Sequence, residues 1–244
     1  MTKKRTGKNK VFLRANWLRM ASANYIVDPC LLEKYLPKGT VLESYNGQHY
    51  VSLVAFRYSQ TRLLNIQIPF YSIFEEINLR FYVKREIAPG KWRSEVAFTK
   101  LFFPKNALTL VAKHIYKENY ETRAMRHKWT ENKEILFTSY GLKKDRWHNF
   151  DLKSAVKSEV IDVNSSAFFF SKHYWGTSHI NEKSCTIYEI QHPEWSAYPI
   201  KEWDINFDFN TVFGSDFKQL TNRQPESVHL FDGSEVVVCK KKIL

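Results

Sequence analysis

One segment of the chain alternates between polar and apolar side chains with a period of two. From Phe74 to Val83 the sequence reads Phe-Glu-Glu-Ile-Asn-Leu-Arg-Phe-Tyr-Val. Successive side chains of a β-strand point to opposite faces, so this segment is predicted to be a strand with two unlike faces. The apolar face carries Ile77, Leu79, Phe81 and Val83, and the polar face carries Glu76, Asn78, Arg80 and Tyr82.

A second pattern, between Val41 and Tyr58, predicts a β-hairpin. Asn46-Gly47 lies near its centre and is the strongest two-residue signal for a tight β-turn. The second arm, Tyr50–Tyr58, is apolar or aromatic at many positions on both faces. Such a strand is typically covered on both sides, as in a filled or covered barrel.

Two segments carry helix signals. Asp28-Pro29 predicts the start of a short helix, with the aspartate as N-cap and the proline at the first helical position. A second helix is predicted to begin at Asn106. Apolar side chains recur there at the spacing of one helix face, at Leu108, Val111, Ala112, Ile115 and Tyr116.

Most of the other patterned segments predict β-strands. They are Trp17–Val27, Trp92–Phe103, Ile135–Tyr140, Trp147–Val163, Phe168–Tyr174, Cys185–Gln191 and Val236–Cys239. Residues 61–70 are predicted to form a loop. No internal repeat or linker stands out, so residues 11–244 are predicted to form a single domain that follows a disordered basic tail at residues 1–10. The expected fold class is α+β, mostly β, with few helices.

The formal net charge of +12 suggests a nucleic-acid partner, but its distribution argues against one. The first ten residues hold five basic side chains and no acidic one, and residues 240–242 are three lysines. Of the 37 basic residues, these eight leave 29 against 25 acidic residues in the whole chain. Basic tails of this kind are usually solvated, so we do not expect a nucleic-acid partner.

The cysteines and apolar runs bear on the location of the protein. Cys30, Cys185 and Cys239 are odd in number and widely spaced, which favours buried free thiols in a reducing compartment. No apolar run is long enough to span a membrane, and polar residues interrupt the stretch after the basic N-terminus that a signal peptide would need. We expect a cytoplasmic protein without membrane association.

Sequence motifs for common cofactors do not occur in the chain. It contains no P-loop, no dinucleotide-binding glycine motif and no G-x-S-x-G, and its eight histidines include no HxxxH or HxH pair. We therefore expect no cofactor and no metal ion.

The polar face of residues 76–82 is the strongest candidate for function. An acid, an amide, a guanidinium and a phenol in one row differ from the lysine, serine and threonine typical of a solvated face. In a pocket, Arg80 would bind a carboxylate or enolate oxygen, and Glu76 would exchange a proton or orient Arg80. Alternatively, the row is a structural network of ion pairs and hydrogen bonds that fills the interior.

Four groups of residues resemble the YqjF-like family of uncharacterised bacterial proteins. In chain order they are Val27-Asp28-Pro29 with Leu36-Pro37 and Tyr45-Asn46-Gly47; the row from Glu76 to Val83; His173-Tyr174-Trp175-Gly176 with His192-Pro193 and Trp195; and Ser227–Ser234. That family is similar in fold to acetoacetate decarboxylase. The resemblance implies an antiparallel β-barrel or cone with peripheral helices and a ligand cavity inside.

The lysine chemistry of acetoacetate decarboxylase does not carry over to this chain. That enzyme forms a Schiff base through a lysine whose pKa a neighbouring lysine lowers, in a Phe-Pro-Lys-Lys motif directly after a helix. Here Glu118-Asn119-Tyr120 follows the predicted helix, without paired lysines. Phe103-Pro104-Lys105 resembles the motif, but it precedes the helix and lacks the second lysine. Members of the family often have an acidic residue directly before the His-Tyr pair, and in this chain that position is occupied by Lys172. Acetoacetate decarboxylase activity is therefore not expected.

The sequence thus predicts an uncharacterised protein that binds a small organic carboxylate or carbonyl compound. Arg80 would anchor the anion, Glu76 would orient it or handle a proton, and Asn78, Tyr82 and Tyr120 would donate or accept hydrogen bonds. A core role is the alternative for Tyr120. Any reaction would be of the lyase or proton-transfer type. The alternative for the whole protein is a non-catalytic interaction protein whose polar row is structural and whose basic tails contact a partner or polyanion.

Overall fold

The computed structural model describes residues 10–67, 72–104 and 119–244. Two expectations fall outside these ranges: the disordered tail, apart from its last residue, and the amphipathic helix that begins at Asn106.

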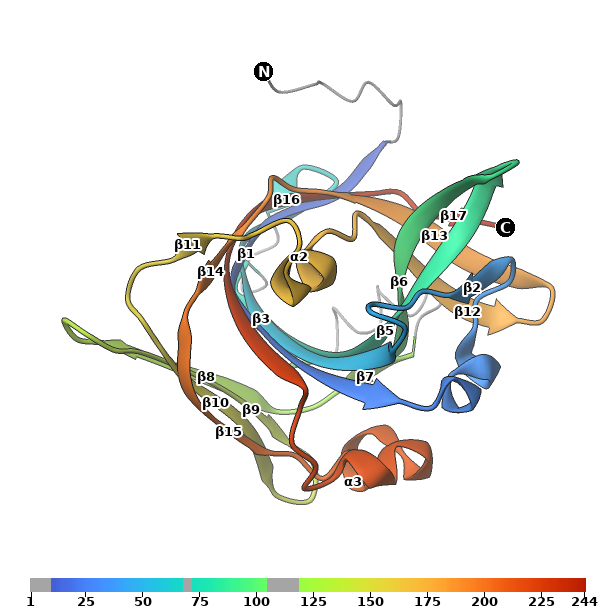
Figure 1. The fold of residues 1–244 in the computed structure, drawn as a ribbon. Helices are drawn as coiled ribbons and strands as arrows, with labels where there is room; N and C mark the ends of the chain where they lie inside the picture. The colour runs from blue at the N-terminus through green and yellow to red at the C-terminus, as the bar shows by residue number, and fades with distance from the viewer. Residues whose placement is uncertain (1–9, 68–71, 105–118) are drawn as a thin grey trace.

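The main sheet closes on itself as a ring (Figure 1). Neighbouring strands in the ring are antiparallel except for one parallel pair, β6 with β12, and the ring closes where β13 pairs with β16. Its members are β1 (Val11–Val27), β3 (His49–Leu63), β5 (Phe74–Ala88), β6 (Lys91–Phe103), β12 (Trp175–Asn181), β13 (Ser184–Gln191) and β16 (Ser227–Cys239). The fold is mostly β, as predicted, and the strand β1 begins well before the expected Trp17.

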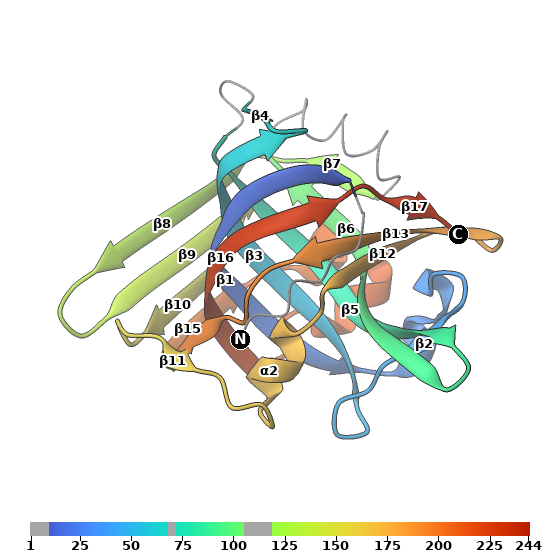
Figure 2. The ribbon, with the colours of Figure 1, turned by 90° about the horizontal axis from the view of Figure 1, so that it is seen from above.

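A second, antiparallel sheet packs on the outside of this ring (Figures 1 and 2). Its order is β15 (Ile200–Asn206), β10 (Trp147–Ser154), β9 (Leu136–Lys143) and β8 (Met125–Glu131). Leu142 and Phe150 from this sheet belong to one buried cluster with Leu79 and Phe81 of β5. The short helices α3 (Phe209–Phe213) and η3 (Ser215–Leu220) add Phe209 to the same cluster.

Short elements complete the fold. These are β2 (Thr40–Leu42), β4 (Ile66–Gln67), β7 (Tyr120–Thr122), β11 (Glu159–Val160), β14 (Ser196–Tyr198), β17 (Lys242–Ile243), and the 3₁₀ turns η1 (Pro29–Leu31) and η2 (Glu33–Tyr35). Asp28 caps η1 as predicted by accepting a hydrogen bond from the Cys30 amide, although the segment forms 3₁₀ turns and no α-helix. Cys185 and Cys239 are buried free thiols, whereas Cys30 is exposed.

The predicted hairpin between Val41 and Tyr58 is only half right. Asn46 and Gly47 form the expected turn, with positive φ angles of 50° and 75°. However, β2 pairs with β5 and not with β3, and only an isolated bridge from Tyr45 to Gln48 closes the turn. A turn signal specifies a local reversal of the chain, whereas the partner of the strand depends on contacts that are distant in sequence.

The prediction of a strand over Phe168–Tyr174 is wrong. Ser166–Ser171 is the helix α2, which lies inside the ring when the ring is viewed along its axis (Figure 1) and toward one end of it in the turned view (Figure 2). The Ser165 side chain caps this helix by accepting a hydrogen bond from the Phe168 amide. The cap and the burial of Phe169 and Phe170 outweigh the β-propensity of three consecutive aromatics.

Candidate functional site

The strand β5 has the two faces that the sequence predicts. Ile77, Leu79, Phe81 and Val83 belong to the cluster that joins the ring to the second sheet. Tyr82, on the opposite face, belongs to the cluster inside the ring, together with Phe169 and Phe170 of α2. All four members of the polar row are buried, with 4% of Glu76, 1% of Asn78, 8% of Arg80 and 2% of Tyr82 exposed.

Tyr82 belongs to a neutral hydrogen-bond network that crosses four strands. Its hydroxyl lies 2.7 Å from the Ser52 hydroxyl on β3, and Ser52 donates to Asn24 Oδ1 on β1 at 2.6 Å. Asn24 in turn donates through Nδ2 to the Ser227 hydroxyl on β16 at 3.0 Å. Paired buried networks of this kind hold strands in one register, so this part of the row contributes to structure.

Glu76 and Asn78 form a second hydrogen-bonded group. Asn78 donates through Nδ2 to Glu76 Oε1 at 2.8 Å, and the Tyr58 hydroxyl donates to Glu76 Oε2 at 2.9 Å. The Asn78 Oδ1 atom is buried and has no hydrogen-bond partner. Glu76 is therefore held in a fixed orientation, and Asn78 presents an acceptor whose hydrogen-bonding capacity is unused.

Arg80 lies between these two groups. Its Nη2 donates to the Phe170 carbonyl of α2 at 3.0 Å, and its guanidinium carbon is 5.8 Å from the centre of the Tyr82 ring. The Arg80 Nε atom is buried without a hydrogen-bond partner. Among the described residues, no carboxylate forms an ion pair with Arg80, in contrast to the buried Arg85, which pairs with Glu95 at 3.1 Å.

Tyr120 lies near the polar row but comes from a different strand, β7. Leu101 of β6 pairs with Asn78 on one side and with Tyr120 of β7 on the other. Tyr120 is 7% exposed, belongs to the interior cluster and stacks on Phe103 with ring centres 5.0 Å apart. The structure therefore brings Tyr120 near the row, and its hydrogen-bonding role stays a prediction.

His173 and Glu43 form a further hydrogen-bonded pair that was not predicted from the sequence. His173 Nε2 lies 3.3 Å from Glu43 Oε2, and the Ser94 hydroxyl donates to the other carboxylate oxygen at 2.7 Å. Burial opposes ionisation of Glu43, but the hydrogen bonds from His173 and Ser94 outweigh it and lower the pKa of the carboxyl group. Burial lowers the pKa of His173 below its usual value. The only sequence signal was the position of His173 in the His-Tyr-Trp-Gly group.

Two further histidines are half-buried against aromatic rings and are neutral at physiological pH. Burial lowers the pKa of His192 and that of His229 to about 4 each. His192 stacks on Trp195 with ring centres 4.1 Å apart, and His229 lies against Phe170 at 5.9 Å. Members of all four groups that resemble the YqjF-like family, namely Tyr45, Tyr82, Trp195 and Phe231, belong to or pack on the interior cluster, whereas Val27 belongs to the outer one.

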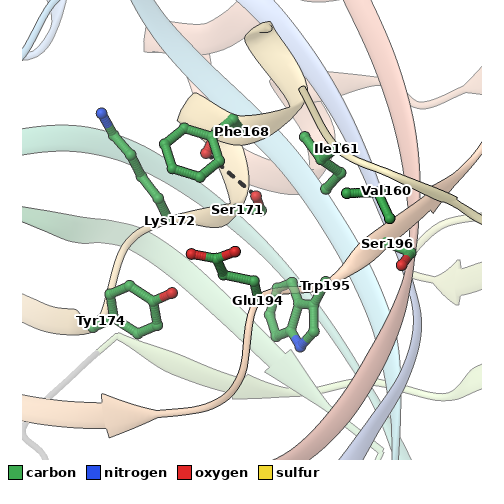
Figure 3. A pocket seen from close by; sticks show the side chains of 9 residues that line it. All are labelled: Val160, Ile161, Phe168, Ser171, Lys172, Tyr174, Glu194, Trp195 and Ser196. Atoms are coloured by element: carbon green, nitrogen blue, oxygen red, sulfur yellow. Dashed lines mark hydrogen bonds between the residues drawn. The ribbon is translucent and has the colours of Figure 1, made fainter. Parts of the chain in front are cut away.

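A pocket of about 150 Å³ opens beside α2 (Figure 3). A cavity of this volume accepts a molecule the size of benzene. Figure 3 shows Glu194 directed between Lys172 and Tyr174, across from Ser171. The polar row does not line this pocket, although Lys172 and Tyr174 flank His173 in sequence. The lining residues are Val160, Ile161, Phe168, Ser171, Lys172, Tyr174, Glu194, Trp195 and Ser196.

The described residues contain neither a cluster of metal ligands nor a helix that could cross a membrane. In residues 10–67, 72–104 and 119–244, no three histidine, cysteine, aspartate or glutamate side chains are grouped as metal ligands would be. No helix in the same ranges has the length and hydrophobicity needed to cross a bilayer.

Solved structures with this fold include enzymes. An acetoacetate decarboxylase from Legionella pneumophila superposes with a TM-score of 0.65 and 13% sequence identity, covering 100% of this chain and 92% of that one. The enduracididine biosynthesis enzyme MppR superposes with a TM-score of 0.66 and 11% identity, covering 99% and 90%. An acetoacetate decarboxylase-like enzyme from Sphingomonas wittichii RW1 gives a TM-score of 0.62 at 11% identity, covering 100% and 96%. At these identities the similarity shows a common fold.

Sequence relatives identify the family. The uncharacterized protein YqjF of Bacillus subtilis (strain 168) is 33% identical over 79 residues, which are 32% of this chain and 33% of YqjF. The match therefore spans about a third of each protein. Residues 14–235 match the DUF2071 family, which is described as an uncharacterized conserved protein. The chain belongs to the DUF2071 family and has the acetoacetate decarboxylase-like fold.

Proposed function

We propose that this protein binds a small organic carboxylate or carbonyl compound inside the ring, with Arg80 as the anchor of the anion. The observation that carries this proposal is the state of Arg80. Arg80 as a whole is 8% exposed, its Nε has no hydrogen-bond partner, and no carboxylate of the described residues pairs with it. A bound carboxylate would supply the missing charge and accept from Nε.

The energetic reason is the cost of burying a charge. A buried cation without a counter-ion loses several kcal/mol of hydration, which one neutral carbonyl does not restore. A planar guanidinium binds a carboxylate through two parallel hydrogen bonds, and the Phe170 carbonyl occupies only Nη2. The Arg80 guanidinium therefore retains donors for a ligand.

The neighbouring residues provide polar contacts around such an anion. Asn78 Oδ1 is a buried acceptor that suits a hydroxyl or amino group of the ligand. Glu76 is fixed by Asn78 and Tyr58, so we assign it the orienting or proton-handling role. The Tyr82 hydroxyl, whose proton is used in its contact with Ser52, would accept a hydrogen bond from the ligand, and the Tyr120 hydroxyl would donate to a ligand carbonyl.

Fold relatives support a ligand of this class. MppR has been solved in complex with pyruvate and with the condensation product of pyruvate and imidazole 4-carboxaldehyde. The absence of the paired-lysine motif from this sequence leads us to propose proton-transfer or lyase-type chemistry without a Schiff base, should the ligand react.

The proposal is tested by thermal unfolding of wild type and Arg80→Gln against small carboxylates, 2-oxo acids and aldehydes. A ligand at 100 times its Kd stabilises a protein by about 2.7 kcal/mol. For a chain of this length, that corresponds to a rise in Tm of roughly 5–10 °C. We expect at least one compound to produce this rise in wild type and none in Arg80→Gln.

The matched control is Arg93→Gln. Unlike Arg80, Arg93 contacts a buried carboxylate, that of Glu95, and its guanidinium lies 3.8 Å from the centre of the Trp175 ring. Its loss should lower the Tm of the free protein while leaving the ligand-induced rise unchanged. If no compound stabilises wild type, the polar row is structural. The basic tails would then be tested for salt-dependent binding of a polyanion, as the interaction-protein alternative requires.

A further inference from the structure

We propose that His173 is the base of this interior site and that its Nδ1 removes a proton from the carbon next to the ligand carbonyl. Glu43 positions the imidazole of His173 through a hydrogen bond to its Nε2. The inference rests on the proposed binding function and adds a reaction class to it.

The contacts of His173 fix its tautomer. Glu43 accepts hydrogen bonds at both carboxylate oxygens, one from Ser94 at 2.7 Å and one from His173 Nε2 at 3.3 Å. An ionised carboxylate only accepts, so Nε2 carries the proton. The Nδ1 atom of a neutral imidazole then holds a free lone pair and can accept a proton.

The Nδ1 atom is buried and has no partner. The side chain of His173 is 2% exposed, and Nδ1 makes no hydrogen bond in the structure. A buried acceptor without a partner is uncommon in native proteins and requires an explanation, of which a catalytic role is one. The structural contacts of this histidine therefore use one nitrogen and leave the other for a reactant.

His173 and the proposed anion anchor, Arg80, both lie against the ring of Tyr82. Its ring centre is 4.8 Å from that of Tyr82, and the Arg80 guanidinium carbon is 5.8 Å from the same ring. Burial lowers the pKa of His173, the Glu43 carboxylate opposes that change, and the charges of Arg80 and Lys172 add to it. The imidazole is thus neutral at physiological pH, as a base must be.

The step is a balanced proton transfer. The C–H bond next to the ligand carbonyl breaks, its proton moves to His173 Nδ1, and its electron pair forms the enolate. Arg80 stabilises the negative oxygen, and Glu43 stabilises the imidazolium. Return of a proton from Nδ1 restores the ligand. In D₂O, the imidazolium exchanges with solvent, so deuterium enters the ligand.

The experiment follows deuterium incorporation into the C3 position of pyruvate and of 2-oxobutyrate by NMR in D₂O. Wild type, His173→Gln and the control His179→Gln are compared, each with binding measured by thermal shift. His179 is an exposed histidine whose Nδ1 lies near the Leu36 carbonyl. We expect His173→Gln to bind with little change and to exchange at least 100-fold more slowly, whereas His179→Gln exchanges like wild type.

The outcomes separate the two proposals. The role of His173 would be overturned if wild type bound a ligand through Arg80 but did not exchange its proton for deuterium. It would also be overturned if His173→Gln exchanged at the wild-type rate. Either result would leave the binding function standing. Absence of binding by both acids in wild type would overturn both proposals for 2-oxo acids.

A second variant covers the case in which His173→Gln does not fold. In Glu43→Gln the carboxylate charge that raises the pKa of His173 is lost, so that pKa falls further and the base weakens. In a plot of exchange rate against pH, we expect the maximal rate to be lower than in wild type. We expect the fall of the rate on the acidic side to occur at lower pH. A purely structural role of Glu43 would change the amount of folded protein and leave the pH of this fall unchanged.

Discussion

At the scale of single residues, Gly233 shows how closely two strands of the ring approach. It pairs with Leu18 across β16 and β1 and has a φ angle of +83°. A Cβ atom added there would lie 2.0 Å from the Trp17 carbonyl oxygen. The position therefore requires glycine both for its backbone conformation and for the space it leaves.

Alanine substitutions separate these two effects. Gly47 has a similar φ of +75°, and a Cβ added to it would meet no atom within 4 Å. Gly47→Ala should cost about 1 kcal/mol of unfolding free energy from left-handed strain alone. Gly233→Ala should cost about 1–3 kcal/mol more, because β1 and β16 must separate. Urea unfolding measures both, and equal losses would refute the close approach.

The candidate site shows at this scale what the sequence could predict. The alternation of Glu76, Asn78, Arg80 and Tyr82 was readable because a strand displays every second residue on one face. His173 and Glu43 are 130 residues apart and meet only through the pairing of distant elements. No local periodicity reports such a contact, so the sequence analysis assigned neither residue to the site.

At the scale of elements, α2 connects the site to the fold. Phe170 is 1% exposed, and its ring packs against those of Tyr50 and Tyr82, each at 5.3 Å. Its carbonyl accepts from Arg80. Helix α2 therefore packs on Tyr82 and holds the guanidinium of Arg80.

Two variants of this helix test that role. Phe170→Ala should cost about 3–5 kcal/mol, because it leaves a cavity among aromatic rings inside the ring. Phe168→Ala, on the pocket side of the same helix, should cost about 1 kcal/mol or less. Denaturant unfolding of both variants gives the comparison. Similar losses would mean that α2 is not anchored through Phe170.

The element scale also explains two of the errors of secondary structure. A run of aromatic residues favours a strand, but the cap at Ser165 and the space inside the ring turn residues 166–171 into a helix. The Asn46-Gly47 turn was predicted correctly, whereas the partner of β2 was not. Both outcomes depended on which element was available for packing.

At the scale of the whole molecule, the two sheets share one core. The apolar face of β5 packs with Tyr140 of β9 and Phe150 of β10, so exposure of one sheet exposes the other. Proteins with a shared core usually unfold in one cooperative transition. This arrangement supports the expectation that residues 11–244 behave as a single domain.

Unfolding by two probes tests that expectation. We expect urea transitions followed by far-UV circular dichroism and by tryptophan fluorescence to coincide. Amides of β3 and β9 should exchange hydrogen with the same free energy of opening. Separate transitions, with β9 opening first, would divide the chain into two independently stable units.

The sequence by itself determined the β-rich class, the two faces of β5 and the family. The reason is that strand periodicity and the family's residue groups are properties of residues close together in the chain. Tertiary structure alone decided the closed ring, the insertion of α2 and the meeting of Arg80 with the Phe170 carbonyl. These features arise where segments far apart in the chain compete to bury the same apolar surface. The physical reason is that burial and pairing are properties of contacts between segments, which no single segment encodes.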